Sequence, residues 1–237
     1  METASKPALP WSIKICGITR LVDAVAAVQA GADAIGLNFY ARSLRFIPPE
    51  TAKVFVHEAK SWKVTPVGVF VNHSSDAIRG IADRSGIQWV QLHGDEPDEV
   101  ADQLIDLNIV RVIRVGCDND FSPAIQLARL WSTKPNVRAI LIDSPIRRRL
   151  DEDDDNVAEF GGTGKTADWH VSKQLVEQLE LPIVLAGGLN PENVTDAIAQ
   201  VRPAAVDVAS GVEGLPGQKN HDQLQKFITN AKAAFHS

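Results

Sequence analysis

The chain has 237 residues, of which 44% are hydrophobic and 23% are charged, a composition typical of a folded globular protein with a large core. Its formal net charge of −6 disfavours broad binding to nucleic acid or to an anionic membrane, because both need a basic surface. Residues 1–10 hold no apolar segment behind a basic region, and no later stretch is long and apolar enough to span a bilayer. We therefore expect a cytoplasmic protein.

Eight short, β-rich apolar runs alternate along the chain with segments of helical periodicity. Eight βα units are the number that closes a (β/α)₈ barrel, and chains of this length commonly form such a TIM barrel as one domain. The sequence therefore predicts the α/β class and a single (β/α)₈ barrel domain over residues 1–237. The predicted strands span residues 13–16, 34–39, 65–71, 88–93, 110–115, 138–143, 182–186 and 205–209.

Helix signals fall between these strands, and each rests on a capping or breaking residue. In chain order they are a helix over 23–30 that ends at Gly31, helix starts at Pro49 and Pro97, a helix over 76–83 capped by Ser74 or Ser75 and ended by Gly86, a helix start at 190–192, and a last helix over 223–235.

One stretch, residues 144–166, is too long for a plain connection between a strand and a helix. It contains a basic run at 147–149 followed by an acidic run at 151–155. We predict a charged loop insertion at about residues 146–160 and interpret it as a solvated loop. A lid or a partner-binding surface is the alternative.

Cys16 ends the first predicted strand and should lie at the barrel mouth, where strand ends carry the chemistry. Side chains alternate along a strand, so Lys14 and Cys16 should face the interior while Ile13 and Ile15 face the helices. A neighbouring lysine favours the thiolate, which would make Cys16 a usable base near neutral pH. A buried structural cysteine is the alternative. We expect Cys117 to be structural and both thiols to be reduced, since two cysteines make neither a disulfide framework nor a metal cluster.

The same alternation applies to the sixth predicted strand. Ile140 and Ile142 should face the helices, which leaves Asp143 facing inward at the strand's end. A partly desolvated carboxyl holds its proton more tightly, so Asp143 could act as a general acid. An aspartate that merely starts a turn is the alternative. Cys16 and Asp143 lie on strands far apart in the ring, where they could flank one small substrate.

Glycine and small residues gather at the ends of the last two strands, at Gly187 and Gly188 and again at Ser210 and Gly211. Taken singly, such residues would only permit turns. Two such turns in succession match the phosphate site that barrels build after their seventh and eighth strands, where backbone N–H groups bind the anion. We therefore predict a phosphate site at these four residues.

Three further features fall near the predicted mouth. Arg45 follows the second strand, and its fork geometry suits a substrate carboxylate, with a solvated loop arginine as the alternative. His93 either lines the mouth or forms a hydrogen bond there, and we assign it no proton transfer. The run 161–166 ends in Gly-Lys-Thr like a nucleotide-binding P-loop, but Glu159 stands where that motif needs glycine, and the run does not directly follow a strand. A glycine-rich loop that folds over the site is the better interpretation.

Six segments in this order resemble the phosphoribosylanthranilate isomerases of tryptophan biosynthesis, and the resemblance covers nearly the whole chain. The segments are KICGIT at 14–19, SLR at 43–45, QLHG at 91–94, GGTGKT at 161–166, LAGGL at 185–189 and VDVASGVE at 206–213. Each is modest alone, and their joint presence is specific. Two features depart from the family pattern: the charged block is longer than the usual connection, and Asn38 stands where an aliphatic residue is expected.

The resemblance implies a (β/α)₈ barrel and a cofactor-free Amadori rearrangement of N-(5′-phosphoribosyl)anthranilate, an aminoaldose, to the corresponding aminoketose. It further implies Asp143 as general acid, Cys16 as general base, Arg45 at the carboxylate and Asp207 at a sugar hydroxyl. His93 is a further candidate contact with the substrate, and the glycine-rich turns would bind the phosphate. The implied partner is a small phosphorylated aminosugar, with no metal, nucleic acid, membrane or obligate protein partner.

Two alternatives remain open at this point. Another phosphate-binding barrel enzyme, such as a ribulose-phosphate epimerase or a thiamine-phosphate synthase, would share the fold and the phosphate turns. An epimerase would need metal-ligating His and Asp side chains at strand ends, where His93 is the one histidine in a predicted strand. A noncatalytic phosphosugar-binding protein would keep the barrel but lack a competent acid and base.

Overall fold

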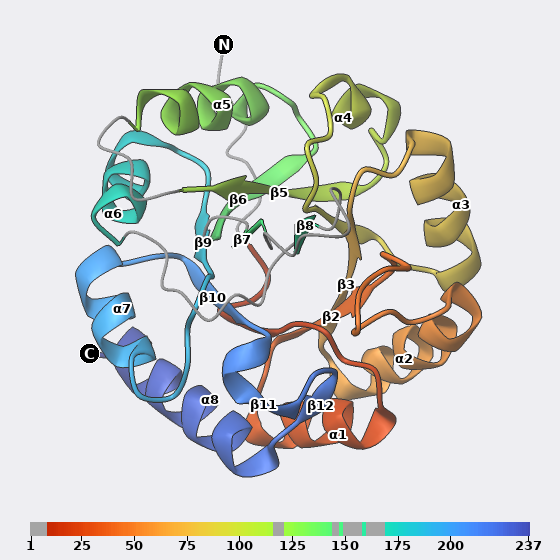
Figure 1. Ribbon diagram of the computed structural model, residues 1–237, viewed down its shortest axis with the longest axis vertical. Coiled ribbons are helices and arrows are strands. Elements are labelled where there is room, and N and C mark those ends of the chain that lie inside the picture. The colour runs from red at the N-terminus through yellow and green to blue at the C-terminus, as the bar shows by residue number, and fades with distance from the viewer. Residues whose placement is uncertain (1–8, 116–120, 144–146, 149–157, 160–168) are drawn as a thin grey trace.

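The protein is a closed barrel of eight parallel strands with helices around it (Figure 1). The computed structural model describes residues 9–115, 121–143, 147–148, 158–159 and 169–237. The strand order is β1-β10-β9-β6-β5-β4-β3-β2, and β1 pairs with both β2 and β10, so the sheet has no open edge. The barrel strands are β1 (Ile13–Ile15), β2 (Ala34–Asn38), β3 (Thr65–Phe70), β4 (Trp89–Leu92), β5 (Asn108–Arg114), β6 (Val137–Asp143), β9 (Ile183–Leu185) and β10 (Ala205–Val208).

Within the described residues, a helix follows each of these strands. The helices are α1 (Leu21–Ala30), α2 (Pro49–Trp62), α3 (Ser75–Ser85), α4 (Glu99–Gln103), α5 (Ser122–Ser132), α6 (Trp169–Gln178), α7 (Val194–Val201) and α8 (His221–Phe235). A short 3₁₀ helix, η1 (Ser210–Val212), and a hairpin of β11 (Glu213–Leu215) and β12 (Gln218–Lys219) lie between β10 and α8. The predicted (β/α)₈ fold is therefore confirmed.

Most predicted element bounds are close to the observed ones, although α4 begins at Glu99 rather than at Pro97, and α5 and α6 were not predicted. Strand ends differ by one or two residues, and β1 ends just before Cys16. Gly31 and Gly86 end α1 and α3 in the left-handed conformation as predicted, with φ of 97° and 82°. The predicted helix start at 190–192 is wrong, because the side-chain oxygen of Asn190 accepts from two following backbone N–H groups and forms a turn that delays α7 to Val194.

The alternation of side chains divides the apolar core into two clusters. Ile140 and Ile142 belong to the large cluster between strands and helices, whereas Ala139 and Leu141 belong to a smaller one inside the barrel. Trp11 and Trp89 close the amino-terminal end of that interior, with ring centroids 4.6 Å apart. The apolar interior thus fills from the amino-terminal end and leaves the carboxyl-terminal end for polar groups.

The long stretch after β6 is described in part. β7 (Arg147–Arg148) and β8 (Ala158–Glu159) form an antiparallel pair that the sequence did not predict. The acidic run 151–155, the glycine-rich run 161–166 and Cys117 lie outside the described residues. Among the helices that the structure describes, none combines the length and apolar character that crossing a membrane requires.

A buried ion pair ties the middle strands together on the helix side. Arg111 on β5 donates to Glu96 over 2.5 Å, and the two side chains are 5% and 1% exposed. Glu96 also accepts from the backbone N–H groups of Asn72 and Gly94, and the Arg111 guanidinium lies 4.7 Å from the ring centroid of Trp131 on α5. Burial lowers the pKa of Arg111, with Glu96 opposing the effect. An arginine remains charged under these conditions, so the pair is ionic.

Removing one charge from this pair should be costly. We expect Glu96→Ala to lower the free energy of unfolding by about 3 kcal/mol, because the buried Arg111 charge loses its partner. Urea unfolding measures the change. The control is Asp95→Ala: Asp95 pairs with Arg114 at 3.0 Å but is 74% exposed, so the loss should stay below about 1 kcal/mol. Equal losses in the two variants would contradict this account of the buried pair.

Candidate active site

Eight of the nine predicted site residues line a single pocket at the carboxyl ends of the barrel strands. They come from the ends of β1, β4, β6, β9 and β10, which lie far apart in sequence. The eight are Cys16, His93, Asp143, Gly187, Gly188, Asp207, Ser210 and Gly211. The ninth, Arg45, is not among the described residues that line this pocket. This end of the barrel is where enzymes of this architecture place their chemistry.

Cys16 lies at the first step beyond β1, where its backbone N–H donates to the carbonyl of Val208 over 2.8 Å. Lys14 points inward as predicted, is 1% exposed, and donates to Asp207 over 2.9 Å. Burial raises the pKa of the Cys16 thiol, and Asp207 adds to the increase; Lys14 and Lys219 act in the opposite direction without overcoming it. Lys14 thus favours the thiolate as expected, but desolvation outweighs the neighbouring cations and keeps the pKa of Cys16 above its ordinary value.

Asp143 ends β6 and faces inward as predicted, with 5% of its surface exposed. His93 follows β4 and its Nε2 lies 3.0 Å from Oδ2 of Asp143. The other ring nitrogen, Nδ1, lies 2.9 Å from Nε2 of Gln91. The sequence left His93 between lining the mouth and forming a hydrogen bond, and the structure places it in both roles. This pair of titratable side chains thus lines the same pocket as the thiol.

The glycine-rich turns after β9 and β10 meet at one end of the pocket. Gly187 and Gly188 both have positive φ, at 79° and 67°. A β-carbon on Gly211 would lie 1.9 Å from the carbonyl oxygen of Leu189, so only glycine lets the two turns approach this closely. Because these residues are small, backbone atoms form this end of the pocket. Backbone N–H groups in such turns can bind an anion.

Arg45 is held by a carboxylate of the protein itself. Its Nε and Nη2 donate to the two oxygens of Glu213 over 2.9 and 2.7 Å, and Lys219 donates to the same carboxylate over 2.9 Å. Burial acts to raise the pKa of Glu213, but Arg45 and Lys219 lower it below its ordinary value. The Arg45 side chain packs against Gly17. A β-carbon on Gly17 would lie 2.5 Å from Cδ of Arg45. Arg45 is therefore fixed next to the residue that follows Cys16.

Asn38 shapes the loop that carries Arg45. Its amide nitrogen donates to the hydroxyl of Ser43, and its oxygen accepts from the backbone N–H of Tyr40. Ser43 in turn accepts from the backbone N–H of Arg45 over 3.1 Å. The sequence marked Asn38 as unusual without finding its partner, and the structure supplies that partner five residues further on.

Gly36 is a site residue that the sequence analysis missed. It lies in the middle of β2, and a β-carbon there would lie 2.7 Å from the Cys16 sulfur and 3.1 Å from Nζ of Lys14. A glycine inside a strand often marks a close approach, and that signal was available. Within the described residues, no group of three or more His, Cys, Asp or Glu side chains is arranged to hold a metal ion.

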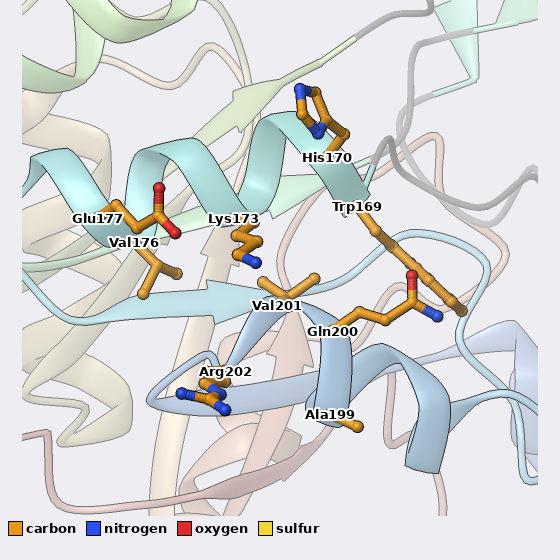
Figure 2. A pocket seen from close by; sticks show the side chains of 9 residues that line it. All are labelled: Trp169, His170, Lys173, Val176, Glu177, Ala199, Gln200, Val201 and Arg202. Carbon is orange, nitrogen blue, oxygen red and sulfur yellow. The ribbon is translucent and has the colours of Figure 1, made fainter.

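A second pocket, of about 570 Å³, lies outside the barrel between α6 and α7 (Figure 2). Its lining comes from these two helices and from Arg202 just beyond α7. Lys173 and Glu177 are exposed there, and none of the residues predicted for the site contributes to the lining. The pocket at the strand ends is therefore the better candidate.

A closed (β/α)₈ barrel whose titratable side chains gather at the carboxyl ends of its strands has the architecture of a barrel enzyme. Residues 13–230 match the family model described as N-(5′-phosphoribosyl)anthranilate (PRA) isomerase. The chain is 40% identical over 221 residues to N-(5′-phosphoribosyl)anthranilate isomerase of Thermotoga maritima, which covers 93% of this chain and 98% of that protein. This chain belongs to the N-(5′-phosphoribosyl)anthranilate isomerase family.

Two solved structures support the assignment. The crystal structure of phosphoribosyl anthranilate isomerase from Thermotoga maritima has a TM-score of 0.78 and 39% identity, and the match covers 94% of this chain and 99% of that one. The second structure is of a phosphoribosyl anthranilate isomerase in complex with reduced 1-(o-carboxyphenylamino)-1-deoxyribulose 5-phosphate. It has a TM-score of 0.74 and 38% identity, with the same coverage.

The close contact at Gly36 leads to a sharp prediction. Gly36→Ala should displace the Cys16 sulfur from its place in the pocket and lower kcat/KM by about two orders of magnitude, since small misplacements in an active site are costly. Steady-state kinetics measures the effect, and circular dichroism checks the fold. The matched control is Gly80→Ala on α3, where a β-carbon would have its nearest neighbour at 3.9 Å. That variant should keep full activity, and an unaffected Gly36→Ala would contradict the prediction.

The raised pKa of Cys16 sets the pH dependence of its reactivity. Below its pKa a thiol ionises about tenfold more for each pH unit, so the rate of alkylation by iodoacetamide should rise about tenfold per unit between pH 7 and 9. The experiment uses a Cys117→Ser background, which leaves Cys16 as the sole thiol. A rate that levels off below pH 8 would show that the lysines overcome burial, contrary to our account.

Proposed function

We propose that this isomerase converts its substrate with Cys16 as general base and Asp143 as general acid. The main observation behind this proposal is that both side chains line one pocket, although β10 and β9 lie between their strands in the barrel. Two groups on different sides of a small sugar are what the reaction needs, since one proton is added and another removed at neighbouring positions.

The proposed sequence conserves protons at each step. Asp143 gives its proton to the furanose ring oxygen as the bond between that oxygen and C1′ breaks, which leaves an iminium ion and a carboxylate. The Cys16 thiolate then takes the proton from C2′ and yields an enolamine. The enol proton leaves and C1′ gains a proton to give the aminoketose, and solvent returns the two groups to their starting states.

The remaining residues bind the ends of the substrate in this proposal. The turns at Gly187, Gly188, Ser210 and Gly211 hold the phosphate through backbone N–H groups, as the small size of these residues and the positive φ of Gly187 and Gly188 favour. Asp207 keeps its bond to Lys14 and offers its carboxylate to a sugar hydroxyl. The guanidinium of Arg45, already oriented by Glu213, receives the anthranilate carboxylate. No step in this sequence draws on a cofactor.

A noncatalytic phosphosugar-binding protein would need the same anion site but neither the thiol nor the carboxyl. Placement of both a competent base and a competent acid beside the phosphate turns favours the enzyme. Family membership favours it further.

Removing either reacting group tests the assignment. We expect Cys16→Ala and Asp143→Asn each to lower kcat by about 100-fold or more, the usual contribution of a positioned acid or base. The loss of anthranilate fluorescence on addition of freshly made phosphoribosylanthranilate measures turnover. Binding of a phosphorylated product analogue to each variant shows that the pocket is intact.

Matched controls separate the roles from general effects of substitution. Cys117→Ser removes the other thiol, and Asp76→Asn makes the same change at an exposed position in α3. Both should turn over like the unmodified enzyme. Near-normal turnover in Cys16→Ala or in Asp143→Asn would remove that residue from the mechanism.

A further inference from the structure

Gln91 is a polar side chain in the barrel interior for which the proposed reaction has no use. It lies on β4 and is 0% exposed. Its Nε2 lies 2.9 Å from Nδ1 of His93, whereas its Oε1 is buried without a hydrogen-bond partner. An apolar side chain of similar size would fill this space and leave no unpaired carbonyl group. Because Nε2 has a hydrogen-bond partner and Oε1 has none, a role for Gln91 in the site must act through its contact with His93.

The contact between Gln91 and His93 selects one form of the imidazole ring. An amide nitrogen donates hydrogen bonds and does not accept them, so Nδ1 of His93 must accept through its lone pair. A neutral imidazole then carries its proton on Nε2. Since Nε2 lies 3.0 Å from Oδ2 of Asp143, the ring donates a hydrogen bond to that carboxyl oxygen.

This hydrogen bond distinguishes the two oxygens of Asp143. Oδ2 accepts from His93 both when the carboxyl group is protonated and when it is ionised, so the proton that can be transferred resides on Oδ1. When Oδ1 loses that proton, negative charge develops on the carboxylate, and a hydrogen bond to a charged acceptor is stronger than one to a neutral acceptor. The Nε2–H group therefore stabilises the conjugate base of the acid as it forms.

We infer that Gln91 is a positioning residue for the general acid. By donating to Nδ1 it holds His93 as the Nε2–H tautomer, which directs the transferable proton of Asp143 to Oδ1 and stabilises the carboxylate that remains. The Oδ1–H bond breaks as the new bond to the substrate's ring oxygen forms, and His93 and Gln91 keep their protons throughout. The inference rests on the proposed role of Asp143 and adds the residues that act through it.

Other charged groups face this array without contacting Nδ1. Cys16 and Asp207 line the same pocket, and Lys14 is bonded to Asp207. Arg114 on β5 donates to the backbone carbonyl of His93 and to Asp95, which fixes the histidine backbone rather than its ring. Among the contacts of the described residues, Gln91 supplies the one to Nδ1.

The tautomer can be observed directly. In protein labelled with ¹⁵N-histidine, with His93 assigned by its loss in His93→Asn, we expect a protonated Nε2 and an unprotonated Nδ1 at neutral pH. In Gln91→Glu the new carboxylate accepts a hydrogen bond, so Nδ1 should become protonated. A protonated Nδ1 in the unmodified protein would mean that the amide presents its oxygen to the ring, and would overturn the inference.

Kinetics of the full chain provides the second readout. Gln91→Met keeps the volume but removes the donor, so kcat should fall about tenfold while KM changes by less than about threefold, the pattern of an interaction made in the transition state. Its midpoint of urea unfolding should not decrease, because the unpaired carbonyl group is also removed. A merely structural glutamine would give the opposite result, with lower stability and unchanged kcat.

Gln91→Glu should lower kcat by about 100-fold, since the protonated Nδ1 leaves Nε2 to compete for the acid's proton. Gln88→Glu makes the same change of charge at an exposed position before β4 and should be neutral. If Asp143→Asn retains turnover, the proposed function fails, and the NMR result still shows whether Gln91 sets the tautomer. If Asp143→Asn is inactive while Gln91→Met retains normal kcat, the inference about Gln91 alone is wrong.

Discussion

The buried ion pair between Lys14 and Asp207 is the contact on which the rest of the site depends. The two residues are register partners on β1 and β10, and their side chains are 1% and 7% exposed. Burial acts to lower the pKa of Lys14, but Asp207 and Cys16 raise it above its ordinary value, so the lysine stays charged. Two charges removed from water are tolerated only when they are paired at close range. This pair therefore holds β1 against β10 and places the thiol in the same pocket as the glycine-rich turns.

The charges around Cys16 are a compromise between stabilising the thiolate and burying it. Lys14 and Lys219 favour ionisation, whereas burial and Asp207 oppose it, and the pKa of the thiol rises as a result. A thiolate that forms less readily is also a stronger base, because nucleophilicity and basicity increase with the pKa of the conjugate acid. Removal of a proton from carbon needs such basicity. For the general base proposed above, burial therefore exchanges ease of ionisation for basicity.

Sequence patterns predicted the parts of this site that depend on local rules, and missed those that depend on contacts across the barrel. Strand alternation placed Lys14, Cys16 and Asp143 inward, and the glycine-rich turns were found from their spacing after the last two strands. The bond between His93 and Asp143 joins residues 50 positions apart, and Arg45 meets Glu213 across 168 positions. The periodicity of a sequence carries no information about contacts between residues this far apart in the chain. The net shift of the Cys16 pKa could not be predicted for a related reason: a neighbouring charge is visible in the sequence, whereas the extent of desolvation depends on the whole barrel.

The outward and inward faces of the strands have different roles, which explains how the barrel keeps buried polar groups and still folds. Alternate residues of the strands pack outward against the helices, where the large apolar cluster and the pair of Arg111 and Glu96 hold the middle strands together. The inward residues fill the amino-terminal half with small apolar side chains and a pair of tryptophan rings. Polar inward side chains lie toward the other half, where Lys14 pairs with Asp207 and His93 with Asp143 between different strands. The outward layer therefore supplies apolar packing and a buried ion pair, while the inward layer brings titratable side chains from distant strands into one pocket.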